Sequence, residues 1–191
     1  MTTGPSPNQP QDSQKRRWAD LWPRVLSGIV LIGIALFALL QGGVVLAILI
    51  GGLFAGAYRE WDIMVNVQSV GWRGWVLMVL LAISALVIPF GLSHSPWAAI
   101  AAWAVPILLA IAFALVAGER TRWWRIAGVL FFGLVILATL IVRGRGIDGI
   151  FAGLFVGFAV WATDTAAFFA GRQIGGAKLS PAISPSKTWS G

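Results

Sequence analysis

The side chains that could do chemistry in this chain collect near its carboxyl-terminal end, in residues 164–191. Asp164 places a carboxylate inside an apolar run, and Lys187 and Thr188 place an ammonium beside a hydroxyl. An ammonium acts as a point charge for phosphate, and a hydroxyl can donate a hydrogen bond to the same ligand. This combination predicts a polyphosphate site, with Asp164 and Lys187 as the candidate catalytic residues.

Other polar residues of this segment are candidates for substrate binding. Pro185 restricts Ser184 to an extended or turn conformation, because the residue before a proline is disfavoured in the helical region. The stretch Gly171-Arg-Gln-Ile-Gly175-Gly176 could cradle phosphate, although it does not match a P-loop and a flexible exit from a helix explains it equally well. The predicted substrate-binding residues are Ser184, Pro185, Thr188, Lys178 and Arg172.

Structural interpretations compete with these functional ones. Asp164 could pair with Arg172 for stability, although an ionisable residue within a membrane span costs ~2.5–3.5 kcal/mol and usually faces a cavity or a partner. Lys187 could simply meet anionic lipid headgroups. The functional interpretation of Asp164 is favoured, because its neighbours Thr163 and Thr165 suit a wet helix face.

A structural interpretation is favoured at two further polar positions, Glu60 and His94, and a functional Glu60 would instead face the bundle interior near the cytoplasmic surface. Glu60 lies between Arg59 and Asp62 at the end of an apolar run, where charges cost little. We expect Arg59 and Asp62 to be solvated among headgroups. His94 lies in a short loop and is predicted to be solvated as well.

The composition is that of a polytopic membrane protein. The chain is 58% hydrophobic and 11% charged, whereas soluble domains carry about 25% charged residues. It has no cysteine and a single histidine, which excludes disulfides, thiolate chemistry and a multi-histidine metal site. The net charge of +7 comes from basic residues between apolar runs, so it indicates membrane topology rather than nucleic-acid binding.

The predicted fold is all-α, with about six transmembrane helices and a cytoplasmic N-terminus. The spans are expected at residues 25–40, 44–58, 75–90, 97–117, 126–142 and 150–170. Residues 1–20 are predicted to be a disordered cytoplasmic lead, and residues 21–191 an incomplete transmembrane domain. The basic residues Arg143 and Arg145 fall in an outer loop, and the other twelve of the fourteen fall inside. We therefore expect a multi-pass protein of the inner membrane, with residues 164–191 ending in the cytoplasm.

Small residues at helical spacing could bring membrane helices together. Gly52 with Gly56, and Gly153 with Gly157, each form a small-xxx-small pair. Such pairs allow close helix approach. Packing within the chain is the simpler interpretation, and a homodimer is the alternative.

The segment 164–191 resembles the phosphatidate cytidylyltransferase family, also called CDP-diacylglycerol synthases. The resemblance lies in Asp164-Thr-Ala-Ala-Phe168, in Gly171-Arg-Gln-Ile-Gly175, in Lys178-Leu-Ser-Pro181 and in the S-P-x-K-T-W-x-G block at Ser184–Gly191. It is looser upstream, at Arg24-Val-Leu-Ser-Gly28 and at Glu60-Trp61. Phe168 stands where the family often has tyrosine.

The resemblance implies an enzyme that joins CTP and phosphatidic acid into CDP-diacylglycerol and pyrophosphate. It implies Mg²⁺ as the cofactor, with metal ligands in a second signature that the family carries beyond the position of Gly191. Lys187, Ser184 and Thr188 would contact the nucleotide, and Asp164 would orient a basic group or the metal shell. On this basis the chain corresponds to the N-terminal two-thirds of the enzyme and is expected to be inactive alone.

Three alternatives remain at this point. The acceptor could be another lipid phosphate, such as a prenyl-ether lipid. The chain could be a non-catalytic membrane fragment. It could also be a small transporter, although only Asp164 is clearly within a span and no inverted repeat is evident.

Overall fold

The computed structural model describes residues 9–66, 70–118, 120–180 and 184–191. Within this part of the chain, six helices precede a two-stranded hairpin. The helices are α1 (Gln9–Gln41), α2 (Gly43–Asn66), α3 (Trp72–Leu92), α4 (Pro96–Val116), α5 (Arg122–Arg143) and α6 (Ile147–Gln173), and the strands are β1 (Lys178–Ser180) and β2 (Ser184–Thr188). The predicted all-α class is confirmed.

Helix length and apolarity identify the chain as a multi-pass membrane protein. Helices α2 to α6 are long and apolar enough to cross a bilayer, and Val25–Gln41 is a shorter apolar stretch of α1. The 21 residues of α3 extend ~32 Å at a rise of ~1.5 Å per residue, close to the ~30 Å hydrocarbon core. Several helices continue beyond the predicted spans, because helical backbone keeps its hydrogen bonds satisfied at the membrane boundary.

The start of α1 differs from the sequence prediction. Its backbone is helical from Gln9, whereas the sequence predicts disorder through residue 20. Pro10 lies in the first turn, where its missing N–H breaks no helical hydrogen bond. The Gln, Lys, Arg, Ala and Leu residues that follow favour helix. Residues 1–8 lie outside the described residues, and the proposed division of the chain at residue 20 stays a prediction.

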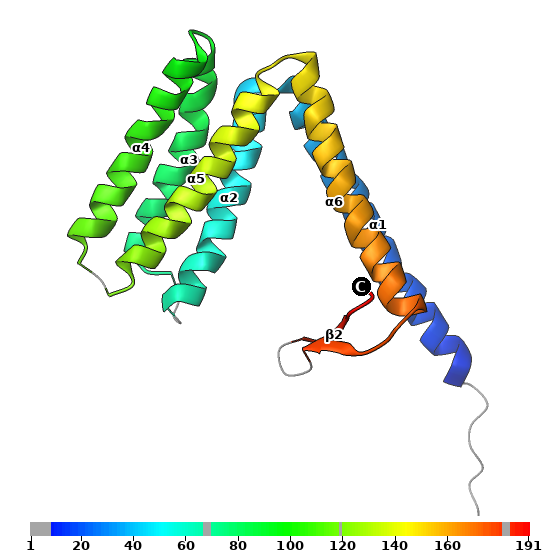
Figure 1. Ribbon diagram of the computed structural model, residues 1–191. Helices are drawn as coiled ribbons and strands as arrows, with labels where there is room; N and C mark the ends of the chain where they lie inside the picture. The colour runs from blue at the N-terminus through cyan, green and yellow to red at the C-terminus, as the bar shows by residue number, and fades with distance from the viewer. Residues whose placement is uncertain (1–8, 67–69, 119, 181–183) are drawn as a thin grey trace, which may run out of the picture.

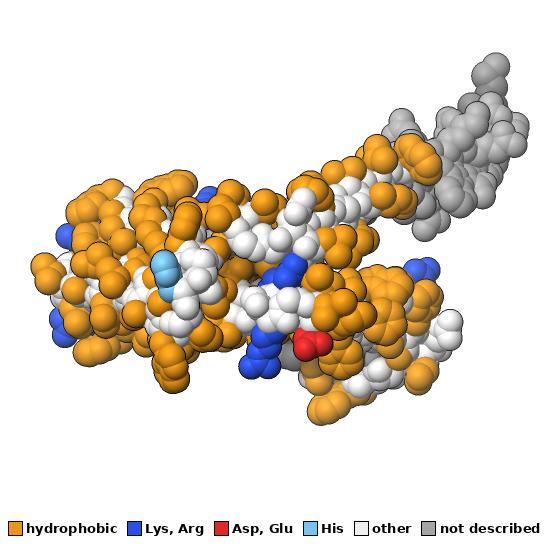
Figure 2. Space-filling view, turned by 90° about the horizontal axis from the view of Figure 1, so that it is seen from above, with side chains coloured by type: hydrophobic (Ala, Val, Ile, Leu, Met, Phe, Trp, Pro, Cys, Tyr) orange, Lys and Arg blue, Asp and Glu red, His pale blue; other side chains and the backbone are white. Residues whose placement is uncertain are grey.

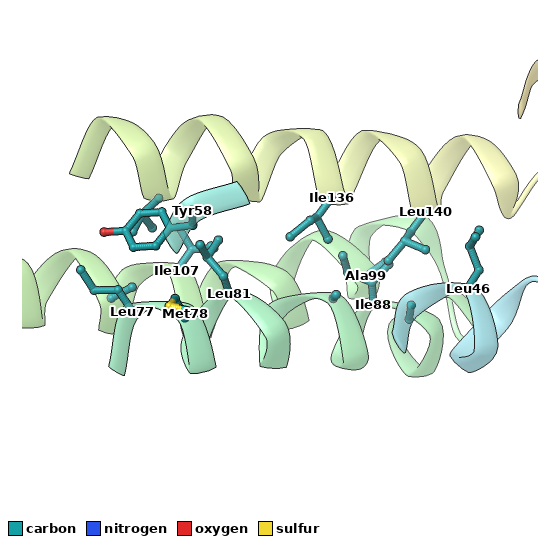
Figure 3. Packing of buried hydrophobic residues seen from close by; sticks show 14 of the residues in the cluster. Leu46, Tyr58, Leu77, Met78, Leu81, Ile88, Ala99, Ile107, Ile136 and Leu140 are labelled. Atoms are coloured by element: carbon teal, nitrogen blue, oxygen red, sulfur yellow. The ribbon is translucent and has the colours of Figure 1, made fainter. Parts of the chain in front are cut away.

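Helices α2 to α5 pack as a four-helix bundle, seen at the left of Figure 1. Its core is built around α3, whose Leu77, Leu81 and Ile88 are fully buried. Ile107 of α4 and Ile136 of α5 belong to the same buried cluster, and Figure 3 shows their packing. This cluster joins the four helices into one packed unit.

Small residues allow the bundle helices to approach closely. A Cβ on Gly51 of α2 would lie 2.9 Å from the Cβ of Ala85 in α3. A Cβ on Gly91 of α3 would collide with the backbone of Ala99 in α4. Within lipid, such close packing replaces the hydrophobic driving force that soluble helices have.

Helices α1 and α6 form an arm that diverges from the bundle (Figure 1). The arm meets the bundle where α5 turns into α6 and α1 turns into α2, and α6 packs only sparsely on other helices. In the apolar 18-residue stretch of α6 that could span a bilayer, no residue is buried. The arm is therefore accessible to lipid or to a partner along most of its length.

The junction between arm and bundle depends on Arg143, the last residue of α5. Its Nε donates to the carbonyl of Leu39 at 2.5 Å, and its Nη2 donates to the carbonyl of Leu40 at 2.7 Å. These carbonyls lie in the last turn of α1, where the backbone carbonyls lack N–H donors from their own helix and the macrodipole favours a cation. Arg143 therefore caps α1.

Candidate functional site

One face of α6 carries the polar residues predicted to act. Asp164, Ala167, Phe168, Gly171 and Arg172 are spaced by three or four residues, which places them along one side of the helix. Asp164 and Arg172 are exposed. The helix therefore presents a carboxylate and a guanidinium on the same stripe, about two turns apart.

A glycine turn reverses the chain after α6. Gly175 and Gly176 have φ values of +63° and +110°, which L side chains rarely adopt. Glycine in a left-handed conformation just past a helix end is a common helix stop. The predicted flexible exit from the last span is thus a defined turn, which sends the chain back along α6.

Strands β1 and β2 then pair antiparallel, with Lys178 opposite Thr188 and Ser180 opposite Ser184. The ladder is extended by the backbone N–H of Trp189, which donates to the carbonyl of Ala177 at 3.1 Å. The sequence prediction that the chain is extended around Ser184 is confirmed.

Two glycines let the end of the hairpin lie directly against α6. A Cβ on Gly191 would lie 2.8 Å from the carbonyl oxygen of Ala167 and 3.1 Å from the Cα of Gly171. A Cβ on Gly171 would lie 3.1 Å from the Oγ1 of Thr188. Any side chain at Gly171 or Gly191 would therefore push the hairpin away from the helix.

A hydrogen-bonded serine adds to this contact. The hydroxyl of Ser190 donates to the carbonyl of Gly175 at 2.5 Å and lies 3.1 Å from the hydroxyl of Thr188. Ser190 thus ties the strand end to the glycine turn and lies beside Thr188. No local sequence pattern indicates the bond to Gly175, because Gly175 lies 15 residues before Ser190 in the sequence.

The result is a cleft of about 720 Å³ between the α6 stripe and the hairpin. Its described lining consists of Asp164, Ala167, Phe168, Gly171, Arg172, Leu179, Lys187, Thr188 and Gly191. The cleft is large enough for a small-molecule ligand, for which pockets range over ~300–1,000 Å³. Its charged side chains are two cations and one carboxylate, which favours an anionic ligand.

The structure brings together four of the predicted site residues: Asp164, Arg172, Lys187 and Thr188 all line this cleft. Lys178 is exposed and Ser184 half-buried, and both lie outside the described lining. Pro185 lies in the backbone of β2, and its side chain lies outside what the structure describes.

Asp164 forms no ion pair with Arg172 or with another basic residue that the structure describes. Within the described residues, the ion pairs are Arg59–Glu60 and Arg125–Asp62, and neither involves Asp164. Asp164 is exposed to the cleft instead. It is therefore available to a ligand.

The cleft offers little protein ligation for a metal ion. The described residues contain no group of three or more His, Cys, Asp or Glu side chains that could hold one. Mg²⁺ is often held by one or two carboxylates together with substrate phosphates and water. Asp164 fits the role of one such carboxylate.

The prediction that Asp62 is solvated was wrong. Its side chain is 1% exposed, and its Oδ1 accepts a hydrogen bond from the Nε of Arg125 at 2.8 Å. Asn66 donates to the same Oδ1 at 3.0 Å and accepts from Thr121 at 2.9 Å. Arg125 lies 63 residues away in sequence, so local reading could not find this pair.

The neighbouring pair behaves as the sequence predicts. Arg59 and Glu60 form an exposed ion pair at 2.6 Å, with side chains 49% and 65% exposed. Glu60 therefore lies at the surface rather than inside the bundle. His94 is exposed in the loop after α3, as expected.

Fold and site together define a polytopic membrane protein with a cleft at one end of its last described helix, and the charged lining of that cleft favours an anionic ligand. Residues 22–191 match the cytidylyltransferase family, and the chain belongs to that family. The match covers every residue that lines the cleft.

Several curated bacterial proteins are similar to this chain. A phosphatidate cytidylyltransferase of Brucella suis biovar 1 (strain 1330) is 31% identical over 185 residues, covering 91% of this chain and 62% of the relative. A phosphatidate cytidylyltransferase of Pseudomonas aeruginosa is 28% identical over 183 residues, covering 88% of this chain and 64% of the relative. No solved structure gave a significant match. The chain thus spans slightly less than two thirds of the length of these relatives.

Proposed function

We propose that this chain forms the nucleotide-binding part of a CTP:phosphatidate cytidylyltransferase. The enzyme would join CTP and phosphatidic acid to give CDP-diacylglycerol and pyrophosphate in phospholipid biosynthesis. The observation that carries the proposal is the cleft, which is lined by the cations Arg172 and Lys187 and by Thr188, with Asp164 beside them. The names and family of the relatives support the same reaction.

In the proposed reaction, an oxygen of the lipid phosphate attacks the α-phosphorus of CTP. A new P–O bond forms to the lipid, the bond from the α-phosphorus to the bridging oxygen breaks, and pyrophosphate leaves with that electron pair. Such transfers are accelerated chiefly by positioning and by charge stabilisation. Lys187 and Arg172 would offset the charge of the triphosphate, and the Thr188 hydroxyl would donate a hydrogen bond to it.

The remaining predicted residues would act less directly. Lys178 and Ser184 lie outside the described lining, so we propose that they support the hairpin that carries Lys187. Pro185 would keep β2 extended. Mg²⁺ is the proposed cofactor: Asp164 would supply one carboxylate ligand, and the ion when bound would neutralise charge on the triphosphate.

The lipid substrate would reach the cleft from the bilayer. Phe168 lines the cleft and is 60% exposed, and no part of the membrane-spanning window of α6 is buried. This apolar, open flank suits acyl chains, whereas the charged lining suits the phosphates. The cleft thus lies where a lipid phosphate and a nucleotide can meet.

The same proposal covers location and assembly. The bias of basic residues toward one side supports an inner-membrane protein whose cleft faces the cytoplasm. A homodimer would use Gly52 and Gly56 of α2, since a Cβ on either meets no described atom within 4 Å. That exposed small-residue face suits close approach by a second helix.

The test of the proposed function is CTP-dependent formation of CDP-diacylglycerol. We expect no turnover in membranes that hold residues 1–191 alone, and turnover when this chain is fused to the carboxyl-terminal part of the Brucella suis relative. In that fusion, Lys187→Ala should lower kcat by about a hundredfold or more, since loss of one charge-stabilising donor typically costs that much. Wild-type turnover by the Lys187→Ala fusion would overturn the assignment of Lys187.

A second acceptor is tested in the same assay. Cytidylyl transfer to a prenyl-ether lipid phosphate would use the same nucleotide cleft, because the lipid pocket is apolar in both cases. Competition between phosphatidic acid and the ether lipid separates the two reactions. If only the ether lipid received the cytidylyl group, the ether lipid rather than phosphatidic acid would be the substrate.

A further inference from the structure

A second cavity lies at the opposite end of α6 from the nucleotide cleft. It occupies about 470 Å³ where the arm meets the bundle, between α1, α2, α5 and α6. Its walls are almost entirely apolar and include Leu39, Leu49, Ala152 and Val156. Arg143, at the end of α5, supplies the charge in its described lining.

Arg143 borders two cavities at once. It also lines a neighbouring space of about 240 Å³, together with Ser93 and Gly144. Its guanidinium donates to the carbonyls of Leu39 and Leu40, and Nη1 makes a longer 3.5 Å contact with the carbonyl of Gly146. Among the described residues, these contacts use three of the five N–H donors of the guanidinium, so donors remain for an anion.

The charged side chains near Arg143, at the opening of the larger cavity, are of both signs, and their sum favours an anion. Arg145 and Asp148 are exposed in the turn between α5 and α6, and His94 lies in the loop at the same end of the bundle. Figure 2 views this end and shows basic and acidic side chains at the middle of the face, surrounded by hydrophobic side chains. Two arginines against one aspartate leave the turn net positive.

We propose that this cavity binds one anionic diacyl phospholipid of the bilayer. One acyl chain lies in the apolar groove between the arm and the bundle, and the headgroup phosphate is held by Arg143 at the mouth. Arginine matches phosphate geometry with paired N–H donors, and a cavity of this size falls in the range of small-molecule pockets. The site is separate from the nucleotide cleft and does not depend on the proposed reaction.

Two glycines of α6, Gly153 and Gly157, line this groove. A Cβ on Gly153 would lie 2.6 Å from a methyl group of Leu39, so α1 and α6 already touch at that level. A Cβ on Gly157 meets no described atom within 4 Å, although Gly157 lines the cavity. A larger side chain at Gly157 therefore fills the groove without colliding with the fold.

The experiment measures lipid retained by the purified 191-residue chain. The protein is extracted from vesicles containing equal amounts of phosphatidylglycerol and phosphatidylcholine with the same acyl chains, and bound lipid is measured by native mass spectrometry. The variants are Gly157→Leu, which fills the groove, and Arg143→Gln, which removes the cation. Gly33→Leu is the matched control, because Gly33 lies on the same arm in open space outside the described lining.

We expect the wild-type chain to retain phosphatidylglycerol at least about fivefold over phosphatidylcholine, the preference one arginine near anionic lipid supplies. Gly157→Leu should lose about fivefold of that retention, and Gly33→Leu should keep it. Arg143→Gln should lose the preference between the two lipids. Equal retention of both lipids by the wild type, or full retention by Gly157→Leu with helicity unchanged, would overturn the proposal. Since Gly157→Leu leaves the α1 cap intact, the test does not depend on the fold of Arg143→Gln.

Discussion

The bundle and the arm, together with the hairpin that follows α6, use charged residues in opposite ways. In the bundle, Asp62 and Arg125 are 1% and 7% exposed and are bonded to each other and to polar neighbours. In the arm, Asp164 and Lys187 are exposed and line a cleft. Buried charges that satisfy one another hold helices together, whereas exposed charges that converge on a cleft remain free to bind a ligand.

This contrast explains why the two regions are packed so differently. The bundle encloses a continuous cluster of buried hydrophobic side chains. In the arm, the apolar stretch of α6 that could span a bilayer contains no buried residue. The hairpin is held against α6 by close contact between Gly171 and Gly191. We infer that the bundle is the scaffold and the arm is the working part.

The largest effect is expected from Asp62→Ala. This change leaves Arg125 buried without its carboxylate, which typically costs ~3–5 kcal/mol of unfolding free energy. Thermal unfolding of the purified chain in detergent should show a large fall in midpoint temperature. Glu60→Ala, in an exposed pair, should cost at most ~1 kcal/mol.

The double variant Asp62→Ala, Arg125→Met sharpens that result. The double variant removes the buried guanidinium together with the carboxylate, so part of the lost stability should return. If Asp62→Ala unfolds at the same temperature as Glu60→Ala, the buried pair does not hold the bundle together.

A smaller effect on stability is expected from Arg143→Gln. The change removes the charged cap on the last turn of α1, whose carbonyl bonds and macrodipole interaction together contribute about 2 kcal/mol. Protease susceptibility of the arm should rise while the bundle resists digestion. Arg145→Gln, exposed in the same turn, should leave both parts unchanged. Equal digestion of the two variants would mean that the cap is not needed.

Gly171→Val should weaken ligand binding and leave the helices intact, while it displaces the hairpin. A Cβ at this position lies 3.1 Å from the Oγ1 of Thr188, so the hairpin must move away from α6. Loss of one charge-assisted contact weakens binding about tenfold, which is the expected loss of CTP affinity. Gly28→Val, in open space on α1, is the control. Unchanged CTP affinity in Gly171→Val would mean that nucleotide binding does not require the hairpin to pack against α6.

Much of the fold could be predicted from the sequence, because apolar runs and glycine breaks are local signals. The runs place the helices, and Pro185 with its neighbours gives the extended strand. The prediction for Asp62 failed because its partner is on another helix. Burial of a charge is decided by packing between α2 and α5, which no local pattern encodes.

The sequence indicates candidate residues of the cleft but not the geometry that brings them together. Asp164, Lys187 and Thr188 stand out by chemical type, and all three line the cleft. The sequence could not show that Gly191 and Ser190 dock the hairpin, since their contacts are with Ala167 and Gly175. The sequence also could not show that Lys178 lies outside the residues described as lining the cleft.

The comparison of Lys187 with Lys178 tests the central claim most directly. Both are exposed lysines of one hairpin, yet only Lys187 lines the described cleft. Equilibrium binding of CTP to the purified chain, in detergent with Mg²⁺, should weaken about tenfold or more in Lys187→Ala and change little in Lys178→Ala. Equal affinities for the two variants would contradict the account, because the cleft would then not be where the nucleotide binds.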